Sequence, residues 1–135
     1  MITDFSQIKN ILKSFQVIAV VGLSPKESRP SNEVAVYLQQ NGYTVIPVNP
    51  GQAEILGWTC YPDLQSIPAP VEVVNIFRRS ELVESVVVDA IKIKARVIWM
   101  QQGIVNEKAA DMARKAGLIV IMDRCIKLDH QDLLG

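Results

Sequence analysis

Histidine, cysteine and net charge are scarce in this sequence, and each scarcity excludes a class of function. The chain has one histidine and two cysteines, Cys60 and Cys125, whose separation matches no zinc-binding pattern. Fourteen basic and fourteen acidic side chains cancel, so no overall field attracts the protein to nucleic acid or anionic lipid. The apolar runs are too short to cross a bilayer, and no signal sequence opens the chain. We therefore expect a cytoplasmic protein that binds neither nucleic acid nor membrane.

The sequence also lacks two glycine motifs by which proteins hold nucleotide phosphates. The dinucleotide-binding pattern is G-x-G-x-x-G, and here only Gly22 is present, because Ser24 and Glu27 occupy the later positions. The second predicted strand ends in Asn49, where dinucleotide-binding domains carry an acidic residue for the ribose hydroxyls. No glycine followed by Lys-Ser or Lys-Thr marks a Walker loop. These absences disfavour a nicotinamide dinucleotide and a P-loop nucleotide site.

What the sequence does contain is a series of short apolar runs separated by helix-like segments. The segment 16–21, apolar after its first residue, leads directly into Gly22. Because this strand has no polar face, both of its faces are expected to be buried, as in a parallel sheet covered by helices. Apolar residues make up 49% of the 135 residues, which is enough for one substantial core. We predict a single domain over residues 1–135.

Strand and helix patterns alternate along the chain, which predicts an α/β fold. The predicted strands are 16–21, 43–50, 71–77, 95–100 and 118–122, with a short edge strand at 60–61. The predicted helices are 4–15, 32–40 capped by Ser31, one capped by Ser80, and one that follows Asn106 and ends at Gly117. Pro47 indicates that the second strand is short, bulged or near an edge, and 123–135 is expected to be a polar tail. The class predicted is a doubly wound, mostly parallel, Rossmann-like three-layer sandwich.

Positive charge gathers in the loops that follow the predicted strands. In a doubly wound sheet these loops converge on one edge, over a crevice where the strand order reverses. Their cationic side chains are Lys26, Arg29, Arg78, Arg79 and Arg124. A helix starting near Ser31 adds free backbone N–H groups and the positive end of its dipole. The arrangement predicts an anionic ligand, with Phe77 and Pro50 as apolar surface for a base or an adenosine ring.

Several stretches of the chain together resemble a known family. They are 20–25, 42–50, 55–57, 97–101, 103–104 and 122–125. Over nearly the whole chain, residues and spacing are similar to the stand-alone CoA-binding domain proteins (YccU-like) and to the amino-terminal CoA-binding part of succinyl-CoA synthetase α subunits. The resemblance implies a Rossmann-like fold that binds coenzyme A or an acyl-CoA. The synthetases also carry a phosphorylated histidine in a second domain, and this chain has no histidine placed for that role, so ligase activity is not expected.

The resemblance also implies a role for each stretch at the crevice. The residues it assigns to the phosphates are Gly22, Leu23, Ser24 and, as a further candidate, Arg29. Those it places beside the adenosine are Val48, Asn49 and Pro50. Those it places across the crevice and at the pantetheine end are Phe77, Arg78, Gln101 and Gly103. The chemistry agrees, because an acid at position 49 would repel the 3′-phosphate of CoA, and arginines form charge-assisted hydrogen bonds with phosphates.

Three kinds of function remain open from the sequence. The first is binding of coenzyme A or an acyl-CoA at the carboxyl edge of the sheet, without catalysis by this chain. The second is an enzyme, either a dinucleotide-dependent oxidoreductase or an acyl- or thiol-transfer enzyme that uses Cys125. The third is a CoA-responsive interaction module whose protein partner is unknown. For Cys125 and His130, the alternative to a nucleophile and its base is a buried cysteine and a surface histidine, since no third partner can be named.

Overall fold

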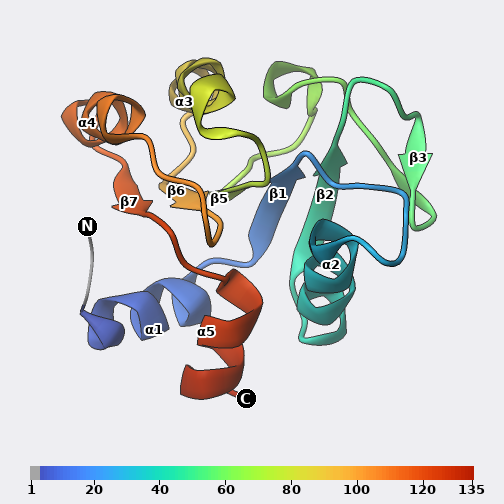
Figure 1. Ribbon diagram of the computed structural model, residues 1–135, viewed down its shortest axis with the longest axis horizontal. Coiled ribbons are helices and arrows are strands. Elements are labelled where there is room, and N and C mark those ends of the chain that lie inside the picture. Colours follow the sequence, from blue (N-terminus) through green and yellow to red (C-terminus); the bar gives the residue numbers. More distant parts are fainter. Residues whose placement is uncertain (1–3) are drawn as a thin grey trace.

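A five-stranded parallel sheet forms the centre of the computed structural model, which describes residues 4–135 (Figure 1). Its strands, in spatial order, are β2 (Thr44–Val48), β1 (Val17–Val21), β5 (Val73–Ile76), β6 (Val97–Met100) and β7 (Ile119–Ile121). Every neighbouring pair is parallel. From β1 the chain moves to β2 on one side and then crosses to β5 on the other, so the strand order reverses between β1 and β5. The predicted doubly wound parallel sheet is confirmed.

Helices cover both faces of the sheet and complete a three-layer sandwich (Figure 1). One face carries α1 (Phe5–Ser14), α2 (Pro30–Gln40) and α5 (Ile126–Leu133), whose buried residues share one core cluster. The opposite face carries α3 (Val83–Lys92) and α4 (Glu107–Lys115), which share a second cluster. Within residues 4–135, no helix combines the length and the apolar character needed to cross a membrane.

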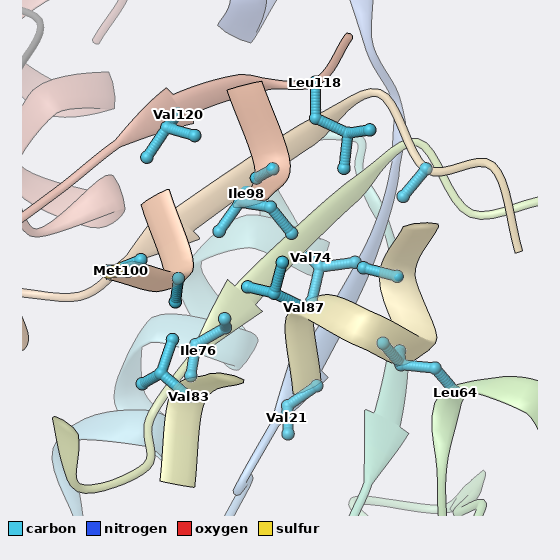
Figure 2. Close-up of a cluster of buried hydrophobic side chains, with 14 of the residues drawn as sticks. Val21, Leu64, Val74, Ile76, Val83, Val87, Ile98, Met100, Leu118 and Val120 are labelled. Carbon is cyan, nitrogen blue, oxygen red and sulfur yellow. The ribbon is translucent and has the colours of Figure 1, made fainter. Parts of the chain in front are cut away.

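Alternation along the buried strands divides the core into two layers. In β1, Ile18 and Val20 belong to the layer with α1, α2 and α5, whereas Ala19 and Val21 belong to the layer with α3 and α4. Successive side chains of a strand point to opposite faces. Figure 2 shows the second layer, where side chains of the sheet pack against Val87 of α3. Both faces of these strands are therefore removed from water, which explains the unbroken apolar runs in the sequence.

The segment after β7 is not the polar tail predicted from the sequence, because most of it folds into α5 beside α1 and α2 (Figure 1). Just before the helix, the Arg124 guanidinium forms a two-pronged ion pair with Asp129, with both distances 2.7 Å. The indole N–H of Trp99, a fully buried core residue, donates to the Arg124 carbonyl at 2.8 Å. The helix thus depends on tertiary contacts that a mostly polar local sequence does not reveal.

The start of α2 also differs from the prediction. The helix begins at Pro30, and Arg29 occupies the N-cap position without a side-chain cap. Proline is favoured at the first helical position because its missing N–H would be unpaired there in any case. Ser31, predicted as the cap, lies inside the first turn, where its Oγ accepts a hydrogen bond from the Ser24 N–H at 3.0 Å. Ser31 therefore fixes the preceding loop rather than the helix end.

The other connections show both agreement and correction. The edge strand predicted at 60–61 lies earlier, as β4 (Trp58–Thr59) paired with β3 (Glu54–Ile55), while Tyr61 forms a bridge to the end of β2. Ser80 does not cap an α-helix but begins a short 3₁₀ turn, η2 (Ser80–Leu82), that precedes α3. Another 3₁₀ turn, η1 (Leu64–Ser66), lies between β4 and β5. Of the three alternatives that Pro47 indicated for β2, the structure shows the edge position. Asn106 caps α4, as predicted, and Asp4 caps α1.

Candidate functional site

Three cavities lie along the carboxyl edge of the sheet, where the strand order reverses. The Arg78 cavity encloses about 280 Å³, and its lining includes Val21, Val48, Pro50, Asp63, Arg78 and Asp89. The Gly22 cavity encloses about 320 Å³, and its lining includes Gly22, Ser24, Lys26, Arg29, Ser31 and Phe77. The Gln101 cavity encloses about 500 Å³, and its lining includes Phe77, Gln101, Gly103, Ile104, Cys125 and Leu128. The location is where ligands bind in open α/β sheets.

The three cavities follow one another along this edge of the sheet. Phe77 lines both the Gly22 cavity and the Gln101 cavity, as does Pro30. Neighbouring residues of the chain line the Arg78 and Gly22 cavities: Val21 at the end of β1 lines the first and Gly22 the second, and Arg78 lines the first and Phe77 the second. We call these three cavities together the groove. It brings together residues of the loops after β1, β2, β5, β6 and β7, as predicted for a doubly wound sheet.

Gly22 is required by the protein backbone itself. Its φ is +88°, and a Cβ placed on it would lie 2.3 Å from the Phe77 carbonyl oxygen. Its N–H donates to the Val48 carbonyl at 2.8 Å. The glycine therefore permits the chain leaving β1 to pass against the chain leaving β5, and this contact is sufficient to explain it. The close approach of a phosphate, inferred from the sequence, stays a prediction.

The loop after Gly22 is held against the first turn of α2. The Asn32 side chain donates to the Ser24 carbonyl at 2.9 Å, and Ser24 Oγ accepts from the Lys26 N–H at 3.1 Å. Both Asn32 and Ser31 are buried, so the loop has a fixed floor. The exposed Lys26 and Arg29 then stand beside the amino end of α2, where the helix dipole adds positive potential. The Gly22 cavity is thus a cationic site suited to an anion.

Residues 48–50 play less uniform roles than the sequence suggested. Val48 and Pro50 line the Arg78 cavity. The Asn49 carboxamide instead joins two loops, since its Nδ2 donates to the Leu23 carbonyl and its Oδ1 accepts from the Gly51 N–H, each at 3.0 Å. Leu23 as a whole residue is fully buried and lines none of the three cavities. Asn49 consequently shapes the groove from beneath.

Two carboxylates of the Arg78 cavity were missed by sequence reasoning. Asp63 accepts hydrogen bonds from the N–H and hydroxyl of Ser66, each at 2.8 Å, and Asp89 accepts one from Gln65 at 2.9 Å. The two acids are 26 positions apart, on η1 and α3, and only the packing of α3 on η1 brings them together. A local motif search has no signal for such a pair. The half-buried Arg78 adds one positive charge to the same cavity.

The other predicted cations are engaged elsewhere. Arg79 forms an exposed ion pair with Glu81, with 3.5 Å between Nε and Oε1. The hydrogen bond to Asp129 raises the pKa of Arg124 and holds its guanidinium on α5. Lys26, Arg29 and Arg78 are therefore the cationic residues, among those predicted, that line the groove.

Gln101 is buried at the end of β6 and has a defined orientation. Its Oε1 accepts hydrogen bonds from Asn75 Nδ2 at 3.2 Å and from the Ile126 N–H at 3.4 Å. Gly103 has a φ of +87°, and its N–H donates to Asp123 at 2.7 Å. These bonds tie the loop after β6 to the loop after β7. Both residues line the Gln101 cavity, at the end predicted for pantetheine.

The residues considered for nucleophilic catalysis are not arranged as a pair. Cys125 is half-buried and lines the Gln101 cavity. The His130 ring is buried rather than at the surface as expected, and its Nδ1 is 2.6 Å from the Tyr37 hydroxyl. Burial lowers the pKa of His130. His130 thus serves the contact between α5 and α2, while Cys60 is buried and burial raises the pKa of its thiol.

Known proteins share this sequence and fold. A family model described as a CoA binding domain matches residues 16–131. The uncharacterized protein YneT of Bacillus subtilis is 45% identical over 125 residues, which are 93% of this chain and 93% of that protein. Acetate–CoA ligase (ADP-forming) I of Archaeoglobus fulgidus is 39% identical over 72 residues, 53% of this chain and 10% of the ligase. The solved structure of a hypothetical protein from Pyrococcus horikoshii superposes with a TM-score of 0.96 at 42% identity, covering 98% of this chain and 93% of that one.

The doubly wound sheet and the groove at its carboxyl edge define a Rossmann-like α/β domain. Within that class, the match over residues 16–131 shows that the chain belongs to the CoA binding domain family. The resemblance drawn from the sequence is therefore confirmed. The chain spans only a tenth of the length of the acetate–CoA ligase, so the activity of that larger protein remains separate from the family assignment.

Proposed function

We propose that this chain binds coenzyme A or an acyl-CoA along the groove, without a catalytic step of its own. Membership of the CoA binding domain family is the observation that carries the proposal. The order of the cavities supports one direction for the ligand. Adenosine occupies the Arg78 cavity, the diphosphate lies over the Gly22 cavity, and pantetheine follows Phe77 into the Gln101 cavity.

Charge supports this direction. Lys26 and Arg29 stand at the cavity that adjoins the amino end of α2, which suits a diphosphate. In the Arg78 cavity the carboxylates of Asp63 and Asp89 accept hydrogen bonds, which suits the amino group of adenine. Among the residues that the structure describes, Arg78 is the one cationic residue that lines this cavity. We therefore assign it to the 3′-phosphate, the group that distinguishes CoA from dephospho-CoA.

Isothermal titration with CoA, dephospho-CoA, NAD and NADP tests the proposal. Binding of CoA is expected, and the absence of any response to CoA species at millimolar concentration would refute the function. Arg78→Gln should weaken CoA binding by roughly tenfold or more, the effect of losing a charge-assisted hydrogen bond. The same substitution should leave dephospho-CoA binding nearly unchanged, because that ligand lacks the 3′-phosphate.

Arg79→Gln is the matched control. Arg79 is the next residue, carries the same charge, and forms an exposed ion pair outside the groove. Its substitution should alter neither affinity, since exposed pairs contribute little. Equal weakening by both variants would mean that only overall charge matters. Equal weakening of CoA and dephospho-CoA by Arg78→Gln would move Arg78 from the 3′-phosphate to the diphosphate.

A further inference from the structure

We infer that the groove is built for an acylated coenzyme A, and that Gln101 donates a hydrogen bond to the thioester carbonyl. The inference rests on the proposed function and names the ligand class of the same site. It starts from Gln101, whose carboxamide oxygen and nitrogen differ in their hydrogen-bond partners. Gln101 is only 6% exposed and lines the Gln101 cavity. Its oxygen accepts two hydrogen bonds, whereas its Nε2 donates none to the residues of the described chain.

The orientation of this carboxamide is fixed by the protein. The Ile126 backbone N–H can only donate, so the Gln101 atom that faces it must be the oxygen. Asn75 Nδ2 reaches the same oxygen from the interior of β5. The Gln101 NH₂ group must then face away from both partners. In residues 4–135, the one fully enclosed side-chain polar atom without a partner is Asn75 Oδ1, which means that Gln101 Nε2 is accessible from the cavity.

A donor held in this way calls for an acceptor on the ligand. When a ligand fills the cavity and excludes water, an unpaired amide donor in it costs free energy, so a ligand that binds here is expected to offer an acceptor to Gln101 Nε2. The surrounding lining is apolar at Val34, Phe77, Ile104 and Leu128, and Glu33 and Lys127 are its charged residues. A thioester suits the apolar part of this lining, because its carbonyl accepts, it has no N–H to satisfy, and a hydrocarbon chain follows it.

The size of the cavity also fits an acyl group. At about 500 Å³ it has the largest volume of the three cavities of the groove, and it lies at the end opposite Arg78. Leu128 in the lining is 48% exposed, so an acyl chain placed against it removes apolar surface from water. Burial of each additional methylene should raise affinity about fourfold until the cavity is filled.

Titrations with four ligands on the full chain separate these contributions. The ligands are CoA, acetyl-CoA, butyryl-CoA and S-butyl-CoA, a thioether of matched length that has no carbonyl. We expect butyryl-CoA to bind more tightly than acetyl-CoA, and acetyl-CoA more tightly than CoA. Butyryl-CoA should also exceed S-butyl-CoA by roughly fivefold, the effect of one hydrogen bond.

Substitution of Gln101 then tests which carbonyl it meets. Gln101→Glu keeps the acceptor for Ile126 and Asn75 but removes the donor, and Gln101→Met removes the donor without adding charge. In either folded variant, the ratio of the butyryl-CoA and S-butyl-CoA affinities should fall to one or below. Gln39→Met is the matched control, because Gln39 is exposed on α2 and lines none of the three cavities; here the ratio should stay as in the unchanged protein.

Each alternative outcome has a distinct meaning. If butyryl-CoA and S-butyl-CoA bind the unchanged protein equally well, or CoA binds most tightly, the acyl inference is overturned while CoA binding stands. If Gln101→Met weakens all four ligands by the same factor, Gln101 meets a pantetheine carbonyl, and the inference is again overturned. If no ligand binds, the proposed function itself fails. Thermal unfolding of each variant shows whether it is folded before its titration is interpreted.

Discussion

At the scale of single residues, two glycines with similar backbone conformations differ in what a side chain placed on them would meet. Gly22 and Gly117 have nearly the same φ, +88° and +89°. A Cβ at Gly117 would meet nothing within 4 Å, whereas one at Gly22 would lie 2.3 Å from the Phe77 carbonyl oxygen. Only Gly22 therefore combines a left-handed backbone with a close approach of two chains. Any side chain at Gly22 shifts Phe77, which lines two of the three cavities.

This comparison predicts unequal effects of alanine at the two positions. Gly117→Ala should lower the free energy of unfolding by about 1 kcal/mol, from backbone strain alone. Gly22→Ala should lower it by about 3 kcal/mol or more, because strain is joined by a clash with a backbone atom that cannot rotate away. Urea unfolding followed by circular dichroism measures both. Equal losses for the two variants would show that the Phe77 contact relaxes freely.

At the scale of elements, α5 lines the end of the groove at the Gln101 cavity. It follows Cys125, it carries the Ile126 N–H that orients Gln101, and it packs beside α1 and α2 (Figure 1). Its anchor is the pair between Arg124 and Asp129, in which the carboxylate side chain is 6% exposed. A buried carboxylate needs its partner, because an unpaired charge in the interior is strongly destabilising. Loss of this pair should therefore loosen the end of the Gln101 cavity.

Substitution of the anchor tests its contribution. Asp129→Asn should reduce the free energy of unfolding by about 2 kcal/mol, below the usual figure for a fully buried pair because Arg124 is 29% exposed. Asp111→Asn is the control, since Asp111 pairs with Arg114 at 3.4 Å on the surface; a loss under about 0.5 kcal/mol is expected there. Chemical denaturation measures the free energy of unfolding of both variants. Similar small losses would mean that α5 is held by its apolar contacts alone.

At the scale of the whole molecule, one cluster of side chains connects α1, α2 and α5, the three helices that cover one face of the sheet. His130 of α5 contacts the hydroxyl of Tyr37 in α2, and its ring meets those of Tyr37 and Tyr43 edge to face. The Tyr43 hydroxyl donates to the Leu12 carbonyl of α1 at 2.5 Å. Because all three helices pack on the same layer of the core, a charge introduced at His130 acts on the stability of the whole fold.

The cluster predicts how stability depends on pH. Burial lowers the pKa of His130 in the folded protein, so the unfolded chain binds the proton at a higher pH than the native protein does. The stabilisation is complete above the ordinary histidine pKa of about 6.5. It decreases as the pH falls from there through the folded pKa, because the native state must charge a buried ring or unfold.

Comparison of the unchanged protein with His130→Gln measures this effect. As His130 is the sole histidine, the difference in unfolding free energy between the two proteins should shrink steadily from pH 7.5 to pH 5, a range chosen to span about 6.5. The carboxylates that titrate below this range are common to both proteins and cancel in the difference. A constant difference across the range would show that the ring is protonated without cost.

The sequence by itself determined the sheet and the class of the protein. Strands buried on both faces favour apolar residues, so β1 and β6 are visible as unbroken apolar runs, and β5 is interrupted by Asn75 alone. The caps at Asp4 and Asn106 were predictable because their hydrogen bonds span only three residues. The family resemblance also lies in the sequence, since short motifs such as the one around Gly22 keep their spacing.

Only the tertiary structure decided which residues of different loops contact one another. The contact that requires Gly22 and the cavity shared by Asp63 and Asp89 each bring together residues that are distant in sequence. The polar helix α5 is anchored by an ion pair whose carboxylate is buried. The same holds for Gln101, whose free donor is defined by Asn75 and Ile126. A local pattern records which face of a segment is apolar, but not which partner a buried polar group finds. That choice follows from packing, because a polar atom removed from water must be paired by whatever the fold brings within reach.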